Sequence, residues 1–252
     1  MSSSNLSKIT SVEIAIPVYN EEDAIRSSGE KILEAITSEK YKGYRITITI
    51  VNNASTDNTI IIVNDLVKKY RNVKLMNLPQ KGRGRALRRC WEGSSAQILV
   101  YMDADLSADI SFLSLLLDAI TKGKADIAIG SRLAKGAKVT GRTIVREVMS
   151  RVYNTLIRLL FHTTFSDAQC GFKAIKKEAF QKLSPLIQNQ NWFFDSEMLI
   201  IAHKLGMKLA EIPLIWQDDP SSTVKIARTA GEDLLGLLRL WRTKPWKTNG
   251  RP

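Results

Sequence analysis

The feature that most constrains this chain is an apolar run, residues 98–102, that leads directly into two acidic residues, Asp103 and Asp105. A run of this length is typical of a strand that is buried on both faces. Residues two positions apart on an extended chain point to the same side, so the two carboxylates are expected together where the strand ends. Ligands bind at that edge of an open α/β sheet, which makes this stretch the first candidate for a site.

The two carboxylates predict a metal ion. Like charges at close range repel each other unless a cation lies between them. Carboxylate oxygens favour Mg²⁺ or Mn²⁺, and these ions in turn favour phosphate groups. We therefore expect Asp103 and Asp105 to hold a metal ion on a diphosphate. The spacing is not specific, because Asp195 and Glu197 share it, and a solvated turn is the alternative.

Composition limits the chain to one sizeable core. Its 252 residues are 44% hydrophobic, as in a single α/β domain. Residues 1–10 are polar and Ser-rich, are expected to be disordered, and lack the form of a secretion signal. No apolar run is long enough to cross a bilayer. Cys90 and Cys170 form no CxxC pair, which indicates free thiols in a reducing compartment.

The net charge of +12 indicates a polyanionic partner. Nucleic acid, anionic lipid and phosphorylated substrates all fit a basic chain. The basic side chains concentrate in residues 132–158, where Glu147 is the single acid, and in residues 239–251. No helix-turn-helix, zinc or RNA-recognition signature is present. We therefore expect no nucleic-acid partner, and a non-enzymatic nucleic-acid-binding protein is a distant alternative.

The first half of the chain alternates between expected strands and helices. Strands are predicted at 12–17, 45–51, 73–78, 98–102, 125–130 and 209–216. This alternation is typical of a parallel sheet with crossover helices, whose polar turns gather at one edge. Asn20 is expected to cap the first helix. No GxGxxG motif follows the first strand and no Walker loop is present, so neither nucleotide-binding fingerprint applies.

Residues 143–161 are predicted to form an amphipathic helix. Its arginines lie opposite an apolar side made of Val145, Val148, Met149, Val152, Leu156, Leu159 and Leu160. Two interpretations stay open: a core helix with a solvated basic face, or an interfacial helix whose apolar side faces lipid. A second amphipathic helix is expected at 224–241, followed by a basic tail that contains Trp241 and Trp246.

Several motifs together resemble inverting glycosyltransferases of the GT-A fold, sequence family two. They are Ile-Pro-Val-Tyr-Asn-Glu at 16–21, Ser-Thr-Asp at 55–57, Lys-Gly-x-Gly-x-Ala at 81–86, Asp-Ala-Asp at 103–105, Gly-Ser-Arg at 130–132, Asp-x-Gln-Cys-Gly-Phe-Lys at 167–173, Phe-Asp-x-Glu at 194–197 and Glu-Ile-Pro at 211–213. Within this family the chain looks most like the dolichyl- and polyprenyl-phosphate sugar transferases. The segment around Cys170 is most similar to dolichyl-phosphate glucosyltransferases, which are related to dolichol-phosphate mannosyltransferase.

The resemblance implies a fold and a domain plan. The fold class is α/β: a single Rossmann-like GT-A domain with a mostly parallel central sheet flanked by helices, and with C-terminal amphipathic helices. The catalytic domain is expected at 11–222, with a nucleotide-binding half at about 11–107 and an acceptor half at about 108–222. Residues 223–252 are expected to form the basic amphipathic helix and tail.

The resemblance also implies a reaction, the inverting, metal-dependent transfer of a hexose from a nucleotide-sugar to a dolichyl or polyprenyl phosphate. UDP-glucose is the favoured donor and GDP-mannose the next. By resemblance, the base and ribose pocket is lined by Pro17, Tyr19, Glu21, Asn53 and Asp57. Arg132 and Lys81 are candidates for added contacts to the diphosphate or the base. Relatives usually carry acidic residues where this chain has Asn52 and Asn53. The identity of the nucleotide base therefore stays open, and so does the alternative that this chain is an inactive member of the family.

A phosphate acceptor changes the catalytic groups that the site needs. Its second pKa is about 6, so it is largely dianionic at neutral pH and needs no general base. It needs cations instead, and Arg142, Arg146 and Lys225 are the candidates. Asp195 and Glu197 are then expected to orient the sugar or the arginines. The alternative is a glycan hydroxyl acceptor, which requires one of these two carboxylates as a base.

The acceptor also implies a place in the cell. A polyprenyl tail stays in the bilayer, so the protein is expected to bind a membrane surface that carries anionic lipid. The basic helix and the Trp-containing tail provide charged and aromatic side chains for this contact. The expected location is cytoplasmic, peripheral at the cytoplasmic face of a membrane.

Overall fold

The computed structural model describes residues 9–218 and 226–250, with the backbone alone for 226–228 and 248–250. The N-terminal segment that is expected to be disordered lies outside the described residues, except for its last two positions. The first strand already begins at Thr10. The division into a nucleotide-binding half and an acceptor half stays a prediction.

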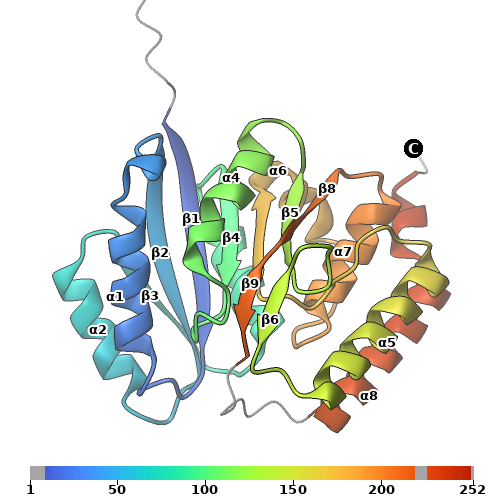
Figure 1. Ribbon diagram of the computed structural model, residues 1–252, viewed down its shortest axis with the longest axis horizontal. Coiled ribbons are helices and arrows are strands. Elements are labelled where there is room, and N and C mark those ends of the chain that lie inside the picture. The colour runs from blue at the N-terminus through green and yellow to red at the C-terminus, as the bar shows by residue number, and fades with distance from the viewer. Residues whose placement is uncertain (1–8, 219–225, 251–252) are drawn as a thin grey trace, which may run out of the picture.

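Seven strands of the described chain form one sheet, in the order β3-β2-β1-β4-β7-β5-β8 (Figure 1). Their bounds are Thr10–Val18 (β1), Tyr44–Asn53 (β2), Val73–Leu78 (β3), Ile98–Met102 (β4), Ile127–Ser131 (β5), Phe172–Lys176 (β7) and Leu209–Pro213 (β8). All neighbours pair in parallel except β7, which runs antiparallel to β4 and β5. The predicted mostly parallel sheet is confirmed, and the ends of β1, β2 and β4 share one edge.

A second, two-stranded ladder pairs β6 (Lys138–Thr140) with β9 (Ile215–Gln217). The sequence did not predict β6, because three partly exposed residues carry no periodic pattern. This ladder brings the segment before residue 143 next to the segment that follows β8, and so helps to build the site described below.

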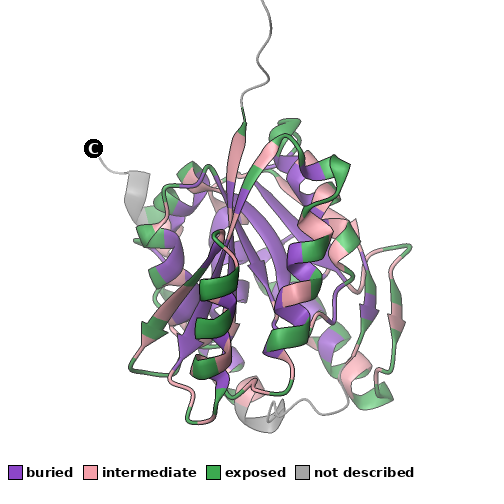
Figure 2. Cartoon of the chain, turned by 90° about the vertical axis from the view of Figure 1, so that its left-hand side faces the viewer, coloured by how far each residue is buried: buried purple, intermediate pink, exposed green. Residues whose placement is uncertain are grey.

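Helices cover both faces of the sheet, and Figure 2 shows the buried strands between them. On one face lie α1 (Ile25–Ile36), α2 (Thr59–Lys69) and α4 (Leu113–Thr121); on the other lie α3 (Arg83–Gly93), α6 (Lys177–Leu183) and α7 (Phe194–Lys204). Short 3-10 helices occupy Glu39–Tyr41, Ile110–Phe112 and Pro245–Gly250. In β1, Ile14 and Ile16 join the first apolar cluster and Ala15 the second, so the strand is buried on both faces.

Asn20 does not cap α1, contrary to the prediction. The N-cap residue is Ala24, and no side chain caps this helix. Asn20 instead adopts a left-handed conformation, with φ of 54°, and its side-chain oxygen accepts the backbone N–H of Thr56 at 2.8 Å. Asparagine tolerates this conformation better than most residues. It therefore ties the loop after β1 to the loop after β2.

The apolar side of α5 (Ile144–Phe161) faces outward. Val145 and Leu159 are 65% and 69% exposed, whereas the buried positions are Ser150, Asn154, Ile157 and Phe161. The interpretation of this segment as a core helix with a solvated basic face is therefore wrong. No helix of the described residues is long and apolar enough to span a bilayer.

The helix α8 (Ile226–Thr243) lies beside α5 at one end of the molecule (Figure 1). It too has an exposed apolar side, made of Leu234, Leu235, Leu238 and Trp241. Trp246, which follows the helix, is not part of this surface, because its ring packs edge-on against Phe161 with centroids 6.2 Å apart. Of the two tryptophans expected to contact lipid, Trp241 alone is exposed.

Candidate active site

The ends of β1 and β2 meet the loop before α3. The side-chain oxygen of Asn53 accepts the backbone N–H of Gly82 at 2.8 Å, which fixes this loop to β2. The ammonium of Lys81 lies 3.1 Å from the ring centroid of Tyr19, and burial lowers the pKa of Lys81. Pro17, the penultimate residue of β1, is half-buried. Residues predicted for the nucleotide pocket are thus brought together, with a cation over an aromatic ring.

Glu21 and Asp57 hold the loops that follow β1 and β2. The backbone N–H of Glu21 donates to the hydroxyl of Thr59 at 2.8 Å. Asp57 accepts hydrogen bonds from the Thr59 hydroxyl at 2.6 Å and from the backbone N–H groups of Thr59 and Glu22. Burial by itself raises the pKa of Asp57, but these hydrogen bonds outweigh it and lower the pKa. Asp57 is therefore an ionised carboxylate that stabilises the wall of the pocket.

Asp103 and Asp105 follow β4 but engage different neighbours. Asp103 accepts a hydrogen bond from the Tyr101 hydroxyl, and its Oδ1 lies 3.7 Å from Nη2 of Arg83 on α3. Asp105 is exposed and lines a groove of about 720 Å³ whose other wall includes the end of α1. The premise that Asp103 and Asp105 lie on an extended strand is wrong, because β4 ends before Asp103 and the chain then turns; a metal ion shared by both stays a prediction.

The donor set fits a divalent metal ion that substrate phosphates complete. In the part of the chain that the structure describes, no group of three or more His, Cys, Asp or Glu side chains could hold a metal ion. Mg²⁺ is commonly bound through one or two carboxylates and substrate phosphate oxygens, and Mn²⁺ accepts the same oxygen ligands. Asp105 supplies an exposed carboxylate of this kind, whose Oδ1 also accepts the backbone N–H of Ser107 at 2.9 Å, and Asp103 contacts Tyr101 and Arg83.

Asp195 and Glu197 are buried in the first turn of α7, and each pairs with an arginine. Asp195 Oδ1 lies 2.9 Å from Nζ of Lys173, and its Oδ2 lies 3.3 Å from Nη2 of Arg83. Glu197 Oε1 lies 2.7 Å from Nη2 of Arg239 on α8, and its Oε2 accepts a backbone N–H. Both side chains are at most 2% exposed. Both carboxylates thus hold arginines in place, one of the two roles expected for them, and the roles as a sugar ligand or a base stay predictions.

Sequence reasoning missed the cations of these pairs, Arg83, Lys173 and Arg239. The motif at 81–86 draws attention to Lys81, and nothing in it distinguishes Arg83 from the arginine two positions later. Lys173 could have been found from the sequence, because it lies between apolar residues of a strand, and a buried lysine needs a charged partner. Arg239 carries no such signal in an amphipathic helix.

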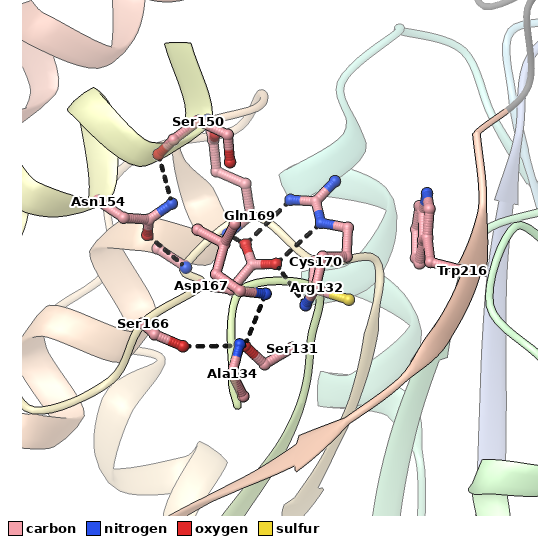
Figure 3. A network of polar contacts seen from close by, with 12 residues as sticks. Ser131, Arg132, Ala134, Ser150, Asn154, Ser166, Asp167, Gln169, Cys170 and Trp216 are labelled. Atoms are coloured by element: carbon pink, nitrogen blue, oxygen red, sulfur yellow. Dashed lines mark hydrogen bonds and ion pairs between the residues drawn. The ribbon is translucent and has the colours of Figure 1, made fainter. Parts of the chain in front are cut away.

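Arg132 forms a two-pronged ion pair with Asp167 (Figure 3). Its Nε and Nη2 donate to the two carboxylate oxygens at 2.8 and 2.9 Å, and its guanidinium lies over the ring of Trp216. Burial by itself raises the pKa of Asp167, but Arg132 outweighs it and lowers the pKa to about 2. Nε and Nη2 of Arg132 are committed to this pair, and a contact of Arg132 with the diphosphate or the base stays a prediction.

The same network fastens α5 to the loop before β7 (Figure 3). The side-chain oxygen of Asn154 accepts the backbone N–H of Ala168 at 2.8 Å, and its amide donates to the backbone of Ser150. The Ser166 hydroxyl lies 2.9 Å from that of Ser131 at the end of β5. Polar contacts of Ser150 and Asn154 thus hold α5 in place beside the buried Ile157 and Phe161, and the apolar side of the helix stays exposed.

Arg142 and Arg146 converge on one carboxylate oxygen. Oδ2 of Asp218 lies 3.8 Å from Nε of Arg142 and 3.9 Å from Nη1 of Arg146, while the Trp216 indole donates to Oδ1 at 2.6 Å. Nη1 of Arg142 also lies 3.2 Å from Glu147. Nε and Nη1 of Arg142 are buried and have no hydrogen-bond partner among the described residues. Burial, followed by the charge of nearby Arg132, lowers the pKa of Arg142.

Two of the three cations predicted for the acceptor are therefore side by side. Lys225, the third, lies outside the described residues. Guanidinium donors that are buried without hydrogen bonds are costly unless an anion satisfies them. The geometry suits an anion with several oxygens, such as a phosphate.

The sheet order and the acidic turn after β4 define a GT-A fold. Structures of glucosyl-3-phosphoglycerate synthase from Mycobacterium tuberculosis share it. The complex with Mn²⁺, UDP-glucose and phosphoglyceric acid superposes with a TM-score of 0.69 at 18% identity, over 92% of this chain and 80% of that one. The complex with UDP gives a TM-score of 0.67 at 18% identity, over 92% and 80% of the two chains.

The chain belongs to glycosyl transferase family 2, whose family model matches residues 13–184. The glycosyltransferase AglD of Haloferax volcanii is 32% identical over 96% of this chain, which spans 38% of the length of AglD. A dolichyl-phosphate beta-glucosyltransferase of Trichomonas vaginalis is 31% identical, over 95% of this chain and 76% of that protein. The enzyme of that name from Saccharomyces cerevisiae is 30% identical, over 86% and 70%.

Proposed function

We propose that the protein transfers glucose from UDP-glucose to a dolichyl or polyprenyl phosphate at a membrane surface, with inversion at the anomeric carbon. The observation that carries this proposal is the convergence of Arg142 and Arg146 on Asp218, together with the buried Nε and Nη1 of Arg142, which have no hydrogen-bond partner among the described residues. The dolichyl-phosphate beta-glucosyltransferases among the relatives support the same acceptor.

The donor occupies the edge of the sheet formed by β1, β2 and β4. Tyr19, Lys81 and Asn53 provide a stacked cation and an amide for the nucleoside, and Asp57 keeps the pocket wall in place. GDP-mannose is the next candidate donor. The UDP-glucose bound in the glucosyl-3-phosphoglycerate synthase structure supports the first choice.

Asp105 is the residue that would hold Mg²⁺ or Mn²⁺, with Asp103 anchoring the turn that carries it. When bound, the ion neutralises charge that develops on the leaving diphosphate. The Mn²⁺ in the structure of the synthase supports this choice of metals. Asp105 is exposed, so a diphosphate can reach it from the groove.

The acceptor phosphate is the nucleophile, and cations position it. A phosphate monoester is already largely ionised at neutral pH, so no general base is required. Arg142 and Arg146 supply the charge, and the fork of a guanidinium suits phosphate oxygens. A glycan hydroxyl acceptor is disfavoured, because Asp195 and Glu197, the candidates for its base, are buried in ion pairs.

The outward apolar sides of α5 and α8 form the membrane-docking surface of this proposal, at the cytoplasmic face. Exposed arginines border the apolar side chains, at Arg151, Arg158 and Arg242. A helix with one apolar and one basic side binds in the interface of an anionic membrane. Arg142 and Arg146 lie at the beginning of α5, which would place the acceptor phosphate close to the bilayer that holds its tail.

A donor screen tests the proposal. Purified protein, Mn²⁺ and a short polyprenyl phosphate are incubated with UDP-glucose or GDP-mannose, and products are read by mass spectrometry. We expect polyprenyl phosphoglucose from UDP-glucose, and none without a divalent ion. Transfer to a free glycan hydroxyl but not to the lipid phosphate would overturn the acceptor assignment.

A further inference from the structure

We propose that Arg83 is a positioning residue that fixes the turn carrying Asp105, by anchoring Asp103 to the interior of the protein. This inference rests on the proposed function, because it gives Asp105 its role at the metal–diphosphate. Arg83 is not expected to touch the substrate in this role; it acts through Asp103.

Arg83 lies between two carboxylates that belong to different elements. Its Nη2 is 3.3 Å from Oδ2 of Asp195 on α7 and 3.7 Å from Oδ1 of Asp103 after β4. The side chain is 13% exposed, and no described residue accepts a hydrogen bond from its buried Nε and Nη2. Charge and packing rather than hydrogen bonds therefore hold the guanidinium at this point.

Two aromatic rings fix the guanidinium from its sides. Its Cζ lies 4.7 Å from the ring centroid of Tyr101 and 4.7 Å from that of Trp192. A cation over an aromatic face is attracted by the ring quadrupole. The Tyr101 hydroxyl also donates to Asp103, so one residue contacts both members of the pair. The position of Asp103 is thus set by Tyr101 and Arg83 together.

The glycines on either side of Arg83 explain how it reaches this place. A Cβ atom at Gly84 would lie 2.6 Å from Cβ of Phe194, and one at Gly82 would lie 2.6 Å from the carbonyl oxygen of Gln190. The beginning of α3 therefore approaches the segment before α7 more closely than residues with side chains would allow. This close approach places Arg83 beside the first turn of α7.

Asp195 gives Arg83 a fixed support. It is held from its other side by the buried Lys173, which also donates to the carbonyl of Cys170. Opposite charges thus alternate from Lys173 through Asp195 and Arg83 to Asp103. The turn after β4 is in this way connected to buried groups of α7 and β7.

Binding of UDP with and without Mn²⁺ tests the inference by calorimetry. Loss of a residue that supports a metal ligand typically costs about 10- to 100-fold in metal affinity or activity. We expect Arg83→Met to weaken the Mn²⁺-dependent increment of UDP affinity by that factor and to leave the metal-free affinity unchanged. Arg89→Met, at an exposed position of the same helix, is the matched control and should match the wild type.

A double variant separates positioning of Asp103 from simple neutralisation of Asp195. If Arg83 serves only as a counter-ion, Arg83→Met combined with Asp195→Asn regains the increment, and the inference is overturned. We expect it to stay low, because Asp103 still lacks its anchor. Arg83→Lys, which keeps the charge but not the planar fork, should give an intermediate value and serves if the methionine variant does not fold.

The outcomes also distinguish this inference from the proposed function. A Mn²⁺-dependent increment in the wild type that Asp105→Asn removes and Arg83→Met leaves intact would overturn the role of Arg83 alone. An increment that is absent from the wild type would overturn both, because Asp105 would then have no metal–diphosphate role to support.

Discussion

The guanidinium of Arg132 binds both carboxylate oxygens of Asp167, with N···O distances of 2.8 and 2.9 Å. The pair joins the loop after β5 to the loop before β7. The ring centroid of Trp216 lies 5.0 Å from Cζ of Arg132. Charges buried in this way are costly when one partner is removed. We therefore expect substitution of Arg132 to lower the free energy of unfolding.

Arg132→Met should leave Asp167 as a buried charge without its partner. We expect a loss of about 3–5 kcal/mol in the free energy of unfolding, measured by urea denaturation. Arg151→Met, which removes an exposed arginine of α5, should change stability by about 0.5 kcal/mol or less. A comparable effect of both substitutions would contradict the assignment of Arg132 to a buried pair.

The stability contributed by Asp167 should depend on pH in a defined window. Its folded-state pKa of about 2 lies below the ordinary value of 3.8, so the ionised form stabilises the fold. The contribution is complete above about pH 4 and is lost as the pH falls toward 2. The stability difference between wild type and Asp167→Asn should shrink by about 2 kcal/mol between pH 5 and pH 2, followed by urea denaturation. A constant difference would argue against the pair.

Asp105→Asn should abolish most transfer while the fold persists. The exposed amide loses the charge that holds the metal ion, and we expect kcat to fall by about 100- to 1000-fold. The far-ultraviolet circular dichroism spectrum and metal-free UDP binding should not change. Asp118→Asn, at an exposed position on α4, is the control. Undiminished turnover by the Asp105 variant would remove the metal site from the mechanism.

Arg142→Ala should act on the acceptor and not on the donor. Its loss removes a charge-assisted contact, and we expect the KM for polyprenyl phosphate to rise by about 10- to 100-fold. The KM for UDP-glucose should stay the same. Arg158→Ala, an exposed position farther along α5, serves as the control when a short, soluble acceptor is used. An effect on the KM for UDP-glucose alone would show that Arg142 binds the donor and not the acceptor.

Charges placed on the apolar side of α8 should prevent docking. Leu235 is 69% exposed, and Leu235→Glu should reduce cosedimentation with vesicles that contain anionic lipid. Leu115→Glu on α4, where the leucine is also exposed, should have no effect. Binding of the wild type should weaken as salt is raised, because arginines contribute to it. Equal vesicle binding by both variants and the wild type would show that α8 is not part of the membrane-docking surface.

Local sequence patterns predicted most of the sheet. The strand expected at 73–78 is β3 within the same bounds, and the apolar run at 98–102 is β4. Both strands could be predicted because burial of one face of a strand requires alternating apolar residues, and burial of both faces requires a continuous apolar run. The short motifs predicted the family, and the family match over residues 13–184 confirms that prediction. The short β6 escaped detection because pairing with β9, and not its own residues, makes it a strand.

The partners of the charged residues were the part that could not be predicted. Arg132 was a candidate for the diphosphate, but its carboxylate partner lies 35 positions away in the sequence. Asp195 and Glu197 had the spacing of a catalytic pair, yet both are buried against cations from other elements. A spacing rule describes one segment, whereas an ion pair depends on which segments the fold brings together.

The sequence by itself determined the class of fold, the family and the segments that meet where β1, β2 and β4 end, because these depend on periodicity and on short motifs. The tertiary structure alone decided which arginines pair with buried carboxylates, which converge on Asp218, and which side of α5 is exposed. The physical reason is that charge pairing and burial are properties of neighbours in space. Those neighbours come from distant parts of the chain, and only packing selects them.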